Sequence, residues 1–432
     1  MRKLFLIVLY SFVLLTHLYA LNLPINIVLH LDKSSQKYLE SLEPWNYINV
    51  PSKANLSTLE YVIGIFRHGN KPPTDTYEGD PYPYDDERYW PNGYSQLTKI
   101  GKKQLYSIGK KLRNRYDGFL SSEYKNEEIL VKSNAVDRVY NSAALLLAGL
   151  YPPKGLYPSK EYDEYCQTEW QPIPIWEQKH DMSKIAKDPS ICPRFYKLEQ
   201  EIEMKINEYT YQYQDIVDYL NNCTGLGIIH LRDLFRYWNL VYFQEQEGYK
   251  RPEWTENGVM EILTNIASST FTALLASNQE MRKLIAGPLV KQFASEIRGK
   301  ILMIGGKDAR IRRQKFHLEG GHGTTLNGLL PALGFEEPFV PHLGSVFLME
   351  LHSSPLGNYI QTLYLTNEEE IQLLEIPGCG YDCPVDEMLE RMDKVTPMNW
   401  YAECQLSSSS NINKRIHFMF LIYVLIYLEE CI

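Results

Sequence analysis

The feature that most constrains the fold is an apolar run that ends abruptly on two basic side chains. Residues 58–66 read "TLEYVIGIF", rich in Val, Ile and aromatic residues, with little alternation between apolar and polar positions. This pattern predicts a strand buried on both faces, as in the interior of a parallel sheet. Arg67 and His68 follow at once, and Gly69 lets the backbone turn sharply. The chain therefore delivers a guanidinium and an imidazole to a strand end.

The next segments alternate between helix and strand. Residues 97–116 place Leu and Ile at three- to five-residue steps with lysines on the other face, which predicts an amphipathic helix capped by Thr98. A second strand is predicted over 127–134, followed by a helix that Pro152 stops. This order is typical of an α/β fold with a mostly parallel central sheet flanked by helices. In such sheets, ligands bind beyond the carboxyl ends of the strands.

The later sequence completes this organisation. Strands are predicted within 313–326, 344–353 and 359–366, and a helix over 325–335. The intervening helical and aromatic segment is interpreted as a smaller helical cap covering one edge of the sheet. The expected parts are a leader at 1–20, a discontinuous α/β core at 46–165 and 285–404, the cap insertion at 166–284, and a Ser/Asn-rich spacer with an apolar tail at 405–432.

The N-terminus indicates the secretory pathway. Two basic residues precede an apolar run over 4–15, and Ala20 offers a small-residue exit, which is the layout of a signal peptide. The run is short for a transmembrane helix. We therefore expect a secreted, extracellular or lysosomal protein whose seven cysteines can form disulfides. Asn55 in "NLS" and Asn222 in "NCT" are candidate glycosylation sites.

Two interpretations of the C-terminal apolar run at 416–428 stay open. It follows a Ser/Asn-rich spacer, as in a lipid-anchor signal, but the chain closes on the polar "EECI". It is also shorter than the roughly 20 residues that a membrane span needs. Membrane attachment through 416–428 is one interpretation, and a terminal helix packed on the body is the other. The formal net charge of −9 argues against a nucleic-acid partner but allows a local basic pocket.

Phosphate-compatible residues follow three separate predicted strands. Lys71 lies just behind Arg67 and His68, Arg138 follows the second strand, and His322 ends the late one. Singly, each has a structural explanation, such as a surface ion pair, a helix cap or a core histidine. Together they predict one pocket, because the carboxyl ends of parallel strands meet at one edge. Guanidinium groups bind phosphate oxygens bidentately, and a neutral imidazole can attack phosphorus.

Three motifs carry a resemblance to a known family. The stretches "FRHGNKPP", "VDRVYNSAALLLAGLYPP" and "GGHGTTLNGLLPAL" resemble, in order, the motifs of the histidine acid phosphatase family. Matches such as "RPEW" and "IPGCGYDCP" extend the likeness over nearly the whole mature chain, which is most similar to animal secreted and lysosomal members, including insect venom acid phosphatases. The resemblance implies hydrolysis of small phosphate monoesters through a phosphohistidine, without a metal or organic cofactor, and it allows a homodimer.

The resemblance also implies roles for individual residues. His68 is the implied nucleophile, and Arg67, Arg138 and His322 are implied to bind the phosphoryl oxygens, with Lys71 adding a further positive charge. The family's disulfides imply two bonds, and the pairing of Cys166, Cys223 and Cys431 stays open. The implied bonds are Cys379 with Cys383 and Cys192 with Cys404. No cysteine pair has zinc-ligand spacing with a second pair, so we expect no cysteine-bound metal.

Two departures from the family pattern concern the chemistry. Lys71 stands where the family has a second arginine, so a two-pronged contact becomes a point contact and weaker phosphate binding is expected. Gly323 stands where the family has the aspartate that protonates the leaving alcohol. General acid catalysis contributes roughly 100- to 10,000-fold. Glu319, Asp137 or a water are the candidate substitutes.

Two functions therefore remain open. The first is a phosphatase with reduced or selective activity. The second is a non-catalytic phosphate-binding protein that retains the fold. A phosphoglycerate-mutase-like transferase, which also uses Arg-His-Gly, is disfavoured by the signal peptide and the cysteines.

Overall fold

The structure is a computed structural model. It describes residues 44–152, 171–178, 182–304, 313–367 and 370–406. The predicted signal peptide, the apolar run at 416–428, Cys166 and Cys431 lie outside the described residues.

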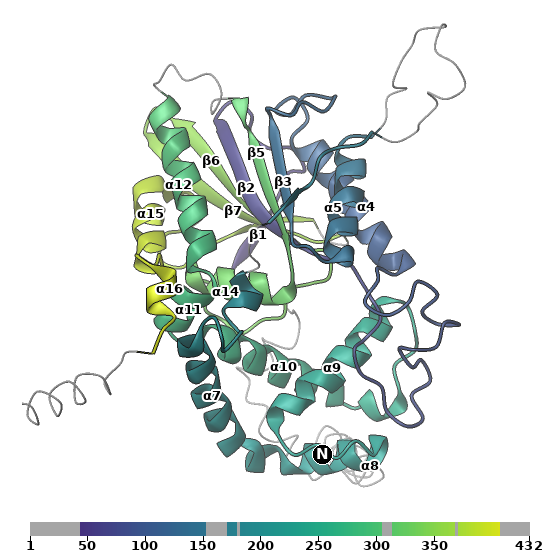
Figure 1. Ribbon diagram of the computed structural model, residues 1–432. Helices are drawn as coiled ribbons and strands as arrows, with labels where there is room; N and C mark the ends of the chain where they lie inside the picture. The colour runs from purple at the N-terminus through teal and green to yellow at the C-terminus, as the bar shows by residue number, and fades with distance from the viewer. Residues whose placement is uncertain (1–43, 153–170, 179–181, 305–312, 368–369, 407–432) are drawn as a thin grey trace, which may run out of the picture.

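A central sheet organises the described chain (Figure 1). Its strands are β1 (Tyr47–Val50), β2 (Leu59–Arg67), β3 (Ile129–Ser133), β4 (Trp176–Glu177), β5 (Phe316–Gly321), β6 (Val346–Ser354), β7 (Gly357–Leu365), β8 (Ile371–Leu374) and β9 (Cys383–Pro384). The order is β1-β8-β7-β6-β2-β5-β3-β4, and β9 pairs with β7.

The predicted α/β fold is confirmed, but the sheet is mixed rather than mostly parallel. Strands β2, β5, β3 and β4 run parallel, whereas β6, β7, β8 and β1 join antiparallel. The physical reason lies in the connections: a tight turn joins β6 to β7, and parallel neighbours would need a longer crossover. The parallel part is the part that carries the predicted phosphate-binding residues.

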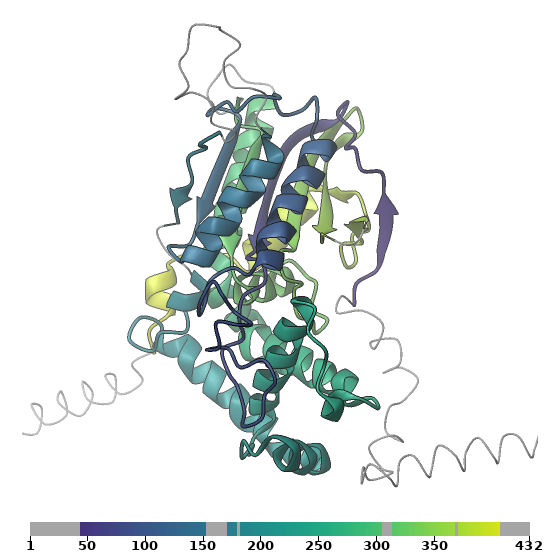
Figure 2. The same ribbon diagram turned by 90° about the vertical axis from the view of Figure 1, so that its right-hand side faces the viewer.

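Helices cover both faces of the sheet. Their bounds are α4 (Lys99–Arg115), α5 (Asp137–Leu150), α6 (Met182–Ile185), α7 (Pro193–Glu208), α8 (Gln214–Thr224), α9 (Leu231–Gln246), α10 (Val259–Ala276), α11 (Gln279–Ile285), α12 (Gly287–Ile304), α14 (Gly323–Ala332), α15 (Val385–Lys394) and α16 (Trp400–Glu403), with short 3-10 turns η2 (Thr210–Tyr213) and η3 (Glu253–Thr255). Figure 2 shows α4 and α5 side by side on one face, and Figure 1 shows α12 and α15 on the other side.

The apolar run of β2 is explained by burial on both faces. Val62 and Phe66 share a core cluster with α4 and α5, whereas Ile63 and Ile65 belong to the cluster formed with α12 and α14. Neither face of the strand needs polar residues, because neither meets water. The cap of α4 is also confirmed, since the Thr98 hydroxyl accepts a hydrogen bond from the Gly101 amide at 3.0 Å.

Helices α8, α9 and α10 form a third core cluster with apolar residues of three loops. Figure 1 shows α9 and α10 beyond one end of the sheet. They cover the carboxyl ends of the strands rather than an edge, because Phe243 of α9 contacts the segment that follows β2. In the described part of the chain, α10 is the helix with the length and apolarity of a membrane span, and 61% of that helix is buried inside the molecule.

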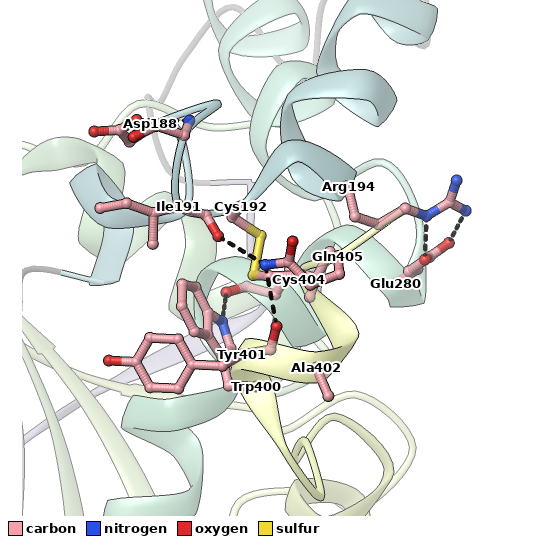
Figure 3. The surroundings of a disulfide bond; sticks show 12 residues. Asp188, Ile191, Cys192, Arg194, Glu280, Trp400, Tyr401, Ala402, Cys404 and Gln405 are labelled. Atoms are coloured by element: carbon pink, nitrogen blue, oxygen red, sulfur yellow. Dashed lines mark hydrogen bonds and ion pairs between the residues drawn. A yellow bond between two sulfur atoms is a disulfide. The ribbon is translucent and has the colours of Figure 1, made fainter. Parts of the chain in front are cut away.

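The structure contains both disulfides that the resemblance implied, Cys192–Cys404 and Cys379–Cys383. The first joins the start of α7 to the end of α16 (Figure 3). Around it, the Trp400 indole donates to the Leu284 carbonyl at 2.7 Å.

Two more predicted sites are exposed: Asn55 and Asn222 both face solvent, as glycosylation would require. Cys223 is also exposed and bonds to no cysteine among the described residues.

A buried ionic network lies between β5 and α12. His317 is fully buried, with Nδ1 at 2.7 Å from Glu296 Oε2 and Nε2 at 2.9 Å from Glu319 Oε1. Lys132 and Gln292 also contact Glu319, at 3.3 and 2.9 Å. Burial alone lowers the pKa of His317, but its hydrogen bond to Glu296 and its close contact with Glu319 outweigh burial and raise that pKa above 6.5. The same contacts hold the pKa of Glu296 and of Glu319 below 4.5 against the opposing effect of burial.

This network gives stability a pH optimum. The raised pKa of His317 adds stability that is complete below 6.5 and is lost as pH rises through the folded-state pKa. The lowered carboxylate pKa values add stability that is complete above 4.5 and is lost as pH falls through them. We expect His317→Gln to lower the free energy of unfolding by about 3 kcal/mol between these limits, and by less on either side. Denaturant titrations across pH measure this.

The matched control is His230→Gln, because His230 is an exposed histidine. We expect His230→Gln to change the free energy of unfolding by no more than about 0.5 kcal/mol. A His317→Gln penalty that does not change between pH 4 and 8 would contradict a charged network.

Candidate phosphate-binding site

The parallel strands bring the predicted residues together at one end of the sheet. Arg67 ends β2 and pairs in register with Gly321, the last residue of β5. The His68 amide then donates to the Gly321 carbonyl at 3.3 Å. As a result, the residues after β2 and β5 start side by side, and the rings of His68 and His322 lie 5.4 Å apart, edge to face.

The surroundings of His68 favour a neutral imidazole whose Nε2 carries the lone pair. The side chain is 4% exposed, and Nδ1 lies 2.9 Å from the Gly69 carbonyl oxygen. A carbonyl only accepts, so Nδ1 carries the hydrogen and Nε2 keeps its lone pair. Burial is the first cause that places the pKa of His68 well below 6.5, and the charges of His322, Arg138 and Arg67 lower it further. This imidazole can therefore act as a nucleophile in acid.

Glycines fix the path of the chain beside His68. The backbone of Gly69 and Asn70 lies directly against Gly101 in the first turn of α4, and a side chain at either glycine would collide with backbone atoms. The Gln104 side chain of α4 accepts a hydrogen bond from the Asn70 backbone N–H at 2.9 Å. On the cap side, the Asn70 side-chain amide donates to the Glu247 carboxylate at 2.9 Å. The segment is thus fixed between the core and the cap.

The two arginines reach the same place from different elements. Arg67 is 7% exposed and donates to the Pro341 carbonyl, while its Nε has no hydrogen-bond partner among the described residues. Arg138, in the first turn of α5, donates to the Ser95 hydroxyl at 2.7 Å and approaches His322 Nδ1 to 3.4 Å. Burial lowers the pKa of Arg67, and the charge of Arg138 adds to this effect.

Arg67 and Lys71 carry buried positive charge in this cluster. Within the described ranges, no Asp or Glu forms an ion pair or hydrogen bond with Arg67 or Lys71, although both are nearly buried. An uncompensated buried charge is unfavourable. A bound anion such as a phosphoryl group would relieve it, with charge-assisted hydrogen bonds to the guanidinium groups.

The late histidine differs from its prediction in one respect. His322 is the N-cap of α14 rather than a strand residue, and α14 begins at Gly323, two residues before the predicted helix. The strand stops at Gly321 because its pairing with β2 ends there, and the Thr325 hydroxyl then accepts from the His322 amide at 3.0 Å.

Neither candidate substitute for the missing acid lies free in the cluster. Glu319 is fully buried in the ionic network with His317. Asp137 is exposed and accepts from Gln96 at 3.1 Å. At position 323 itself, an added Cβ would lie 3.3 Å from Cζ and Nε of Arg67, so a carboxylate there would begin beside that guanidinium.

Sequence reasoning missed several neighbours of the cluster. Ser95, Pro341 and Phe243 touch its charged groups, and they come from two loops and the cap. No periodicity or motif marks them, because each contact joins segments far apart in the chain. The one local signal is the long apolar face of α9, which predicts that Phe243 is buried but not that it contacts Lys71.

The fold and the cluster together describe an α/β protein with a histidine-centred, cationic cluster at its strand ends. The family model of the histidine phosphatase superfamily (branch 2) matches residues 58–364, and the chain belongs to this family. Human lysosomal acid phosphatase is 30% identical, over 83% of this chain and 82% of its own. Human prostatic acid phosphatase is 31% identical, over 81% and 89%.

Solved structures agree on the fold. The phytase from Citrobacter braakii superposes with a TM-score of 0.59 and 17% identity, over 81% of this chain and all of its own. The Hafnia alvei phytase in complex with tartrate gives 0.58 at 15% identity. At this identity the likeness concerns the fold alone.

Proposed function

We propose that the chain is an acid phosphatase that hydrolyses small phosphate monoesters through a phosphohistidine at His68. The observation that carries the proposal is the buried His68 imidazole, whose Nδ1 bonds to the Gly69 carbonyl. It lies in a cluster with the buried cations Arg67 and Lys71, which form no ion pair with a carboxylate among the described residues. The family relatives that are named acid phosphatases support it.

The proposed reaction has two steps. His68 Nε2 attacks phosphorus while Arg67, Arg138, Lys71 and His322 hold the phosphoryl oxygens. The ester P–O bond breaks, its oxygen keeps the electron pair and takes a proton, and the alcohol leaves. Water then attacks the phosphohistidine and releases inorganic phosphate. Phosphoryl transfer of this kind depends mainly on positioning and on neutralising oxygen charge, which three cations can supply.

The acid optimum follows from the electrostatics of His68. A nucleophilic histidine must be neutral, and an ordinary histidine is protonated below pH 6.5. Because burial and neighbouring charges lower the pKa of His68 well below that value, the nucleophile stays active in acid. We therefore expect the acidic limb of kcat/KM far below pH 6.5.

The proposed location is the lysosome or the exterior of the cell. Two disulfides suit an oxidising compartment, and the named relatives include lysosomal enzymes. The division into core and cap at the predicted boundaries, membrane attachment and a homodimer stay predictions.

Turnover of an aryl and an alkyl phosphomonoester by the purified full chain tests the proposal. We expect phosphate release from the aryl ester near pH 5, and a phosphoryl label on the quenched protein that is stable in alkali and labile in acid, as a phosphohistidine is. Phosphate assays and rapid quenching of labelled ester measure these.

The alternative function is favoured by Gly323, which leaves the leaving group without the family's carboxyl donor. In that case the chain would bind inorganic phosphate in calorimetry but release none from either ester and carry no label. That combination would replace the phosphatase by a non-catalytic phosphate-binding protein.

A further inference from the structure

Lys71 is an ammonium group in an environment that a lysine rarely occupies. It is 8% exposed, donates to the Pro72 carbonyl at 2.8 Å, and lies 4.4 Å from the centre of the Phe243 ring. Neither contact carries a full negative charge. An ammonium has three hydrogens, so two remain after the bond to Pro72. Those two can serve a phosphoryl oxygen and the neighbouring ester oxygen.

The cap creates this environment. Phe243 belongs to α9 and is itself buried, so the cap helix shields the ammonium from water. Burial is the main cause that lowers the pKa of Lys71 to about 7. The charges of Arg138 and Arg67 act in the same direction, and Asp75 opposes them. In acid the group is protonated, yet it gives up its proton far more readily than an ordinary lysine.

We propose that Lys71 is the proton donor to the leaving alcohol, in place of the carboxyl group that Gly323 lacks. The inference rests on the proposed phosphatase function. As His68 Nε2 bonds to phosphorus, the ester P–O bond breaks and its electron pair takes a proton from Lys71 Nζ, which gives the alcohol and a neutral amine. In the second step the amine accepts a proton from the attacking water, the N–P bond breaks, and phosphate leaves.

The two departures from the family pattern then compensate one another. An arginine at position 71 would bind phosphate but could not release a proton, because its pKa stays above about 12. The lysine binds phosphate less well than an arginine would, but it can donate a proton. The loss of a carboxyl at 323 and the gain of a lysine at 71 place the acid on the cap side of the site, beside Phe243.

Lys71→Arg tests the proposal, because it keeps the charge and removes the donor. We expect kcat for an alkyl phosphomonoester to fall roughly 100- to 10,000-fold, and kcat for a nitrophenyl ester, whose leaving group needs no proton, to fall less than about tenfold. Lys300→Arg is the matched control. Lys300 is 7% exposed, lies 4.6 Å from the Tyr61 ring centre, and has a pKa lowered to about 8, mainly by burial. Lys300 lies on α12, which contributes no residue to the proposed reaction, so Lys300→Arg should leave kcat for both esters unchanged.

Rescue separates a missing acid from a damaged site. Adding Gly323→Asp to Lys71→Arg should restore alkyl turnover at least tenfold, and more below pH 5, because it supplies a carboxyl donor beside Arg67. An equal loss for both esters in Lys71→Arg, with no rescue, would make Lys71 a phosphate ligand only and overturn the proposal.

The unaltered chain gives an independent readout. The ratio of alkyl to aryl kcat/KM should be constant in acid and fall about tenfold per pH unit above about 7, as Lys71 loses its proton. A bound phosphoryl group stabilises the ammonium. The ratio of alkyl to aryl kcat should therefore fall at a higher pH than the ratio of kcat/KM does. Aryl turnover without alkyl turnover would overturn the inference alone, whereas the absence of release from every ester would overturn the phosphatase function with it.

Discussion

His68→Ala is expected to abolish phosphate release from aryl and alkyl esters alike. Removing the atom that attacks phosphorus removes the covalent pathway, and losses on the order of 10⁶-fold in kcat are typical when a covalent nucleophile is deleted. Steady-state phosphate assays near pH 5 measure the loss, and the labelled phosphoprotein should disappear with it. The folded structure should persist, because the imidazole's hydrogen bond to the Gly69 carbonyl is local.

Two controls make this result specific. His230→Ala removes an exposed histidine at the start of α9 and should keep turnover within about twofold. The His68→Ala protein should still bind inorganic phosphate in calorimetry, because Arg67, Arg138 and Lys71 remain. Turnover within tenfold of the unaltered chain would mean that another group attacks phosphorus.

Arg115→Ala is expected to destabilise the fold by about 3–5 kcal/mol, since it leaves a buried carboxylate without its cation. Arg115 of α4 meets Glu350 of β6 with two bonds of 2.7 and 2.8 Å, and both side chains are almost completely buried. The Tyr116 hydroxyl donates to the same carboxylate at 2.7 Å. Denaturant unfolding measures the change. Lys103→Ala, at an exposed position of the same helix, should stay within about 0.5 kcal/mol.

The loss of unfolding free energy caused by Arg115→Ala should also depend on pH. Burial alone raises the pKa of Glu350, but bonds from His352 and Arg115 outweigh it and lower that pKa to about 2. The stability from the lowered pKa is complete above 4.5 and is lost as pH falls through about 2. The penalty of Arg115→Ala should therefore shrink as pH falls from 4.5 to about 2, because the unaltered chain loses the stability of the pair over that range. A penalty under 1 kcal/mol at pH 6 would contradict a stabilising pair.

The elements nearest the cluster could be predicted because their signals are local. The run before Arg67, the cap at Thr98 and the helix stopped before Pro152 each depend on neighbours in the sequence, and β2, α4 and α5 form where expected. To predict that Arg67 and His322 lie close together, one further rule was needed: parallel strands end at a common edge of the sheet.

The remaining features depend on contacts that no local pattern encodes. The antiparallel half of the sheet follows from short connections after β6. The contact between Lys71 and Phe243 joins residues far apart in the chain, so the sequence showed a lysine but not its buried, uncompensated state. Likewise, Glu319 looked available as an acid until His317 and Glu296 placed it in a buried network.

The Cys192–Cys404 bond imposes an order on biosynthesis. Its partners are 212 residues apart, so at about 5–20 residues per second Cys192 leaves the ribosome some 10–40 s before Cys404 does. Cys379 and Cys383, only four residues apart, can pair almost as soon as they emerge. Cys223 is made before Cys404 and is a competing thiol during the wait, and disulfide exchange can correct a wrong pair once Cys404 has been made.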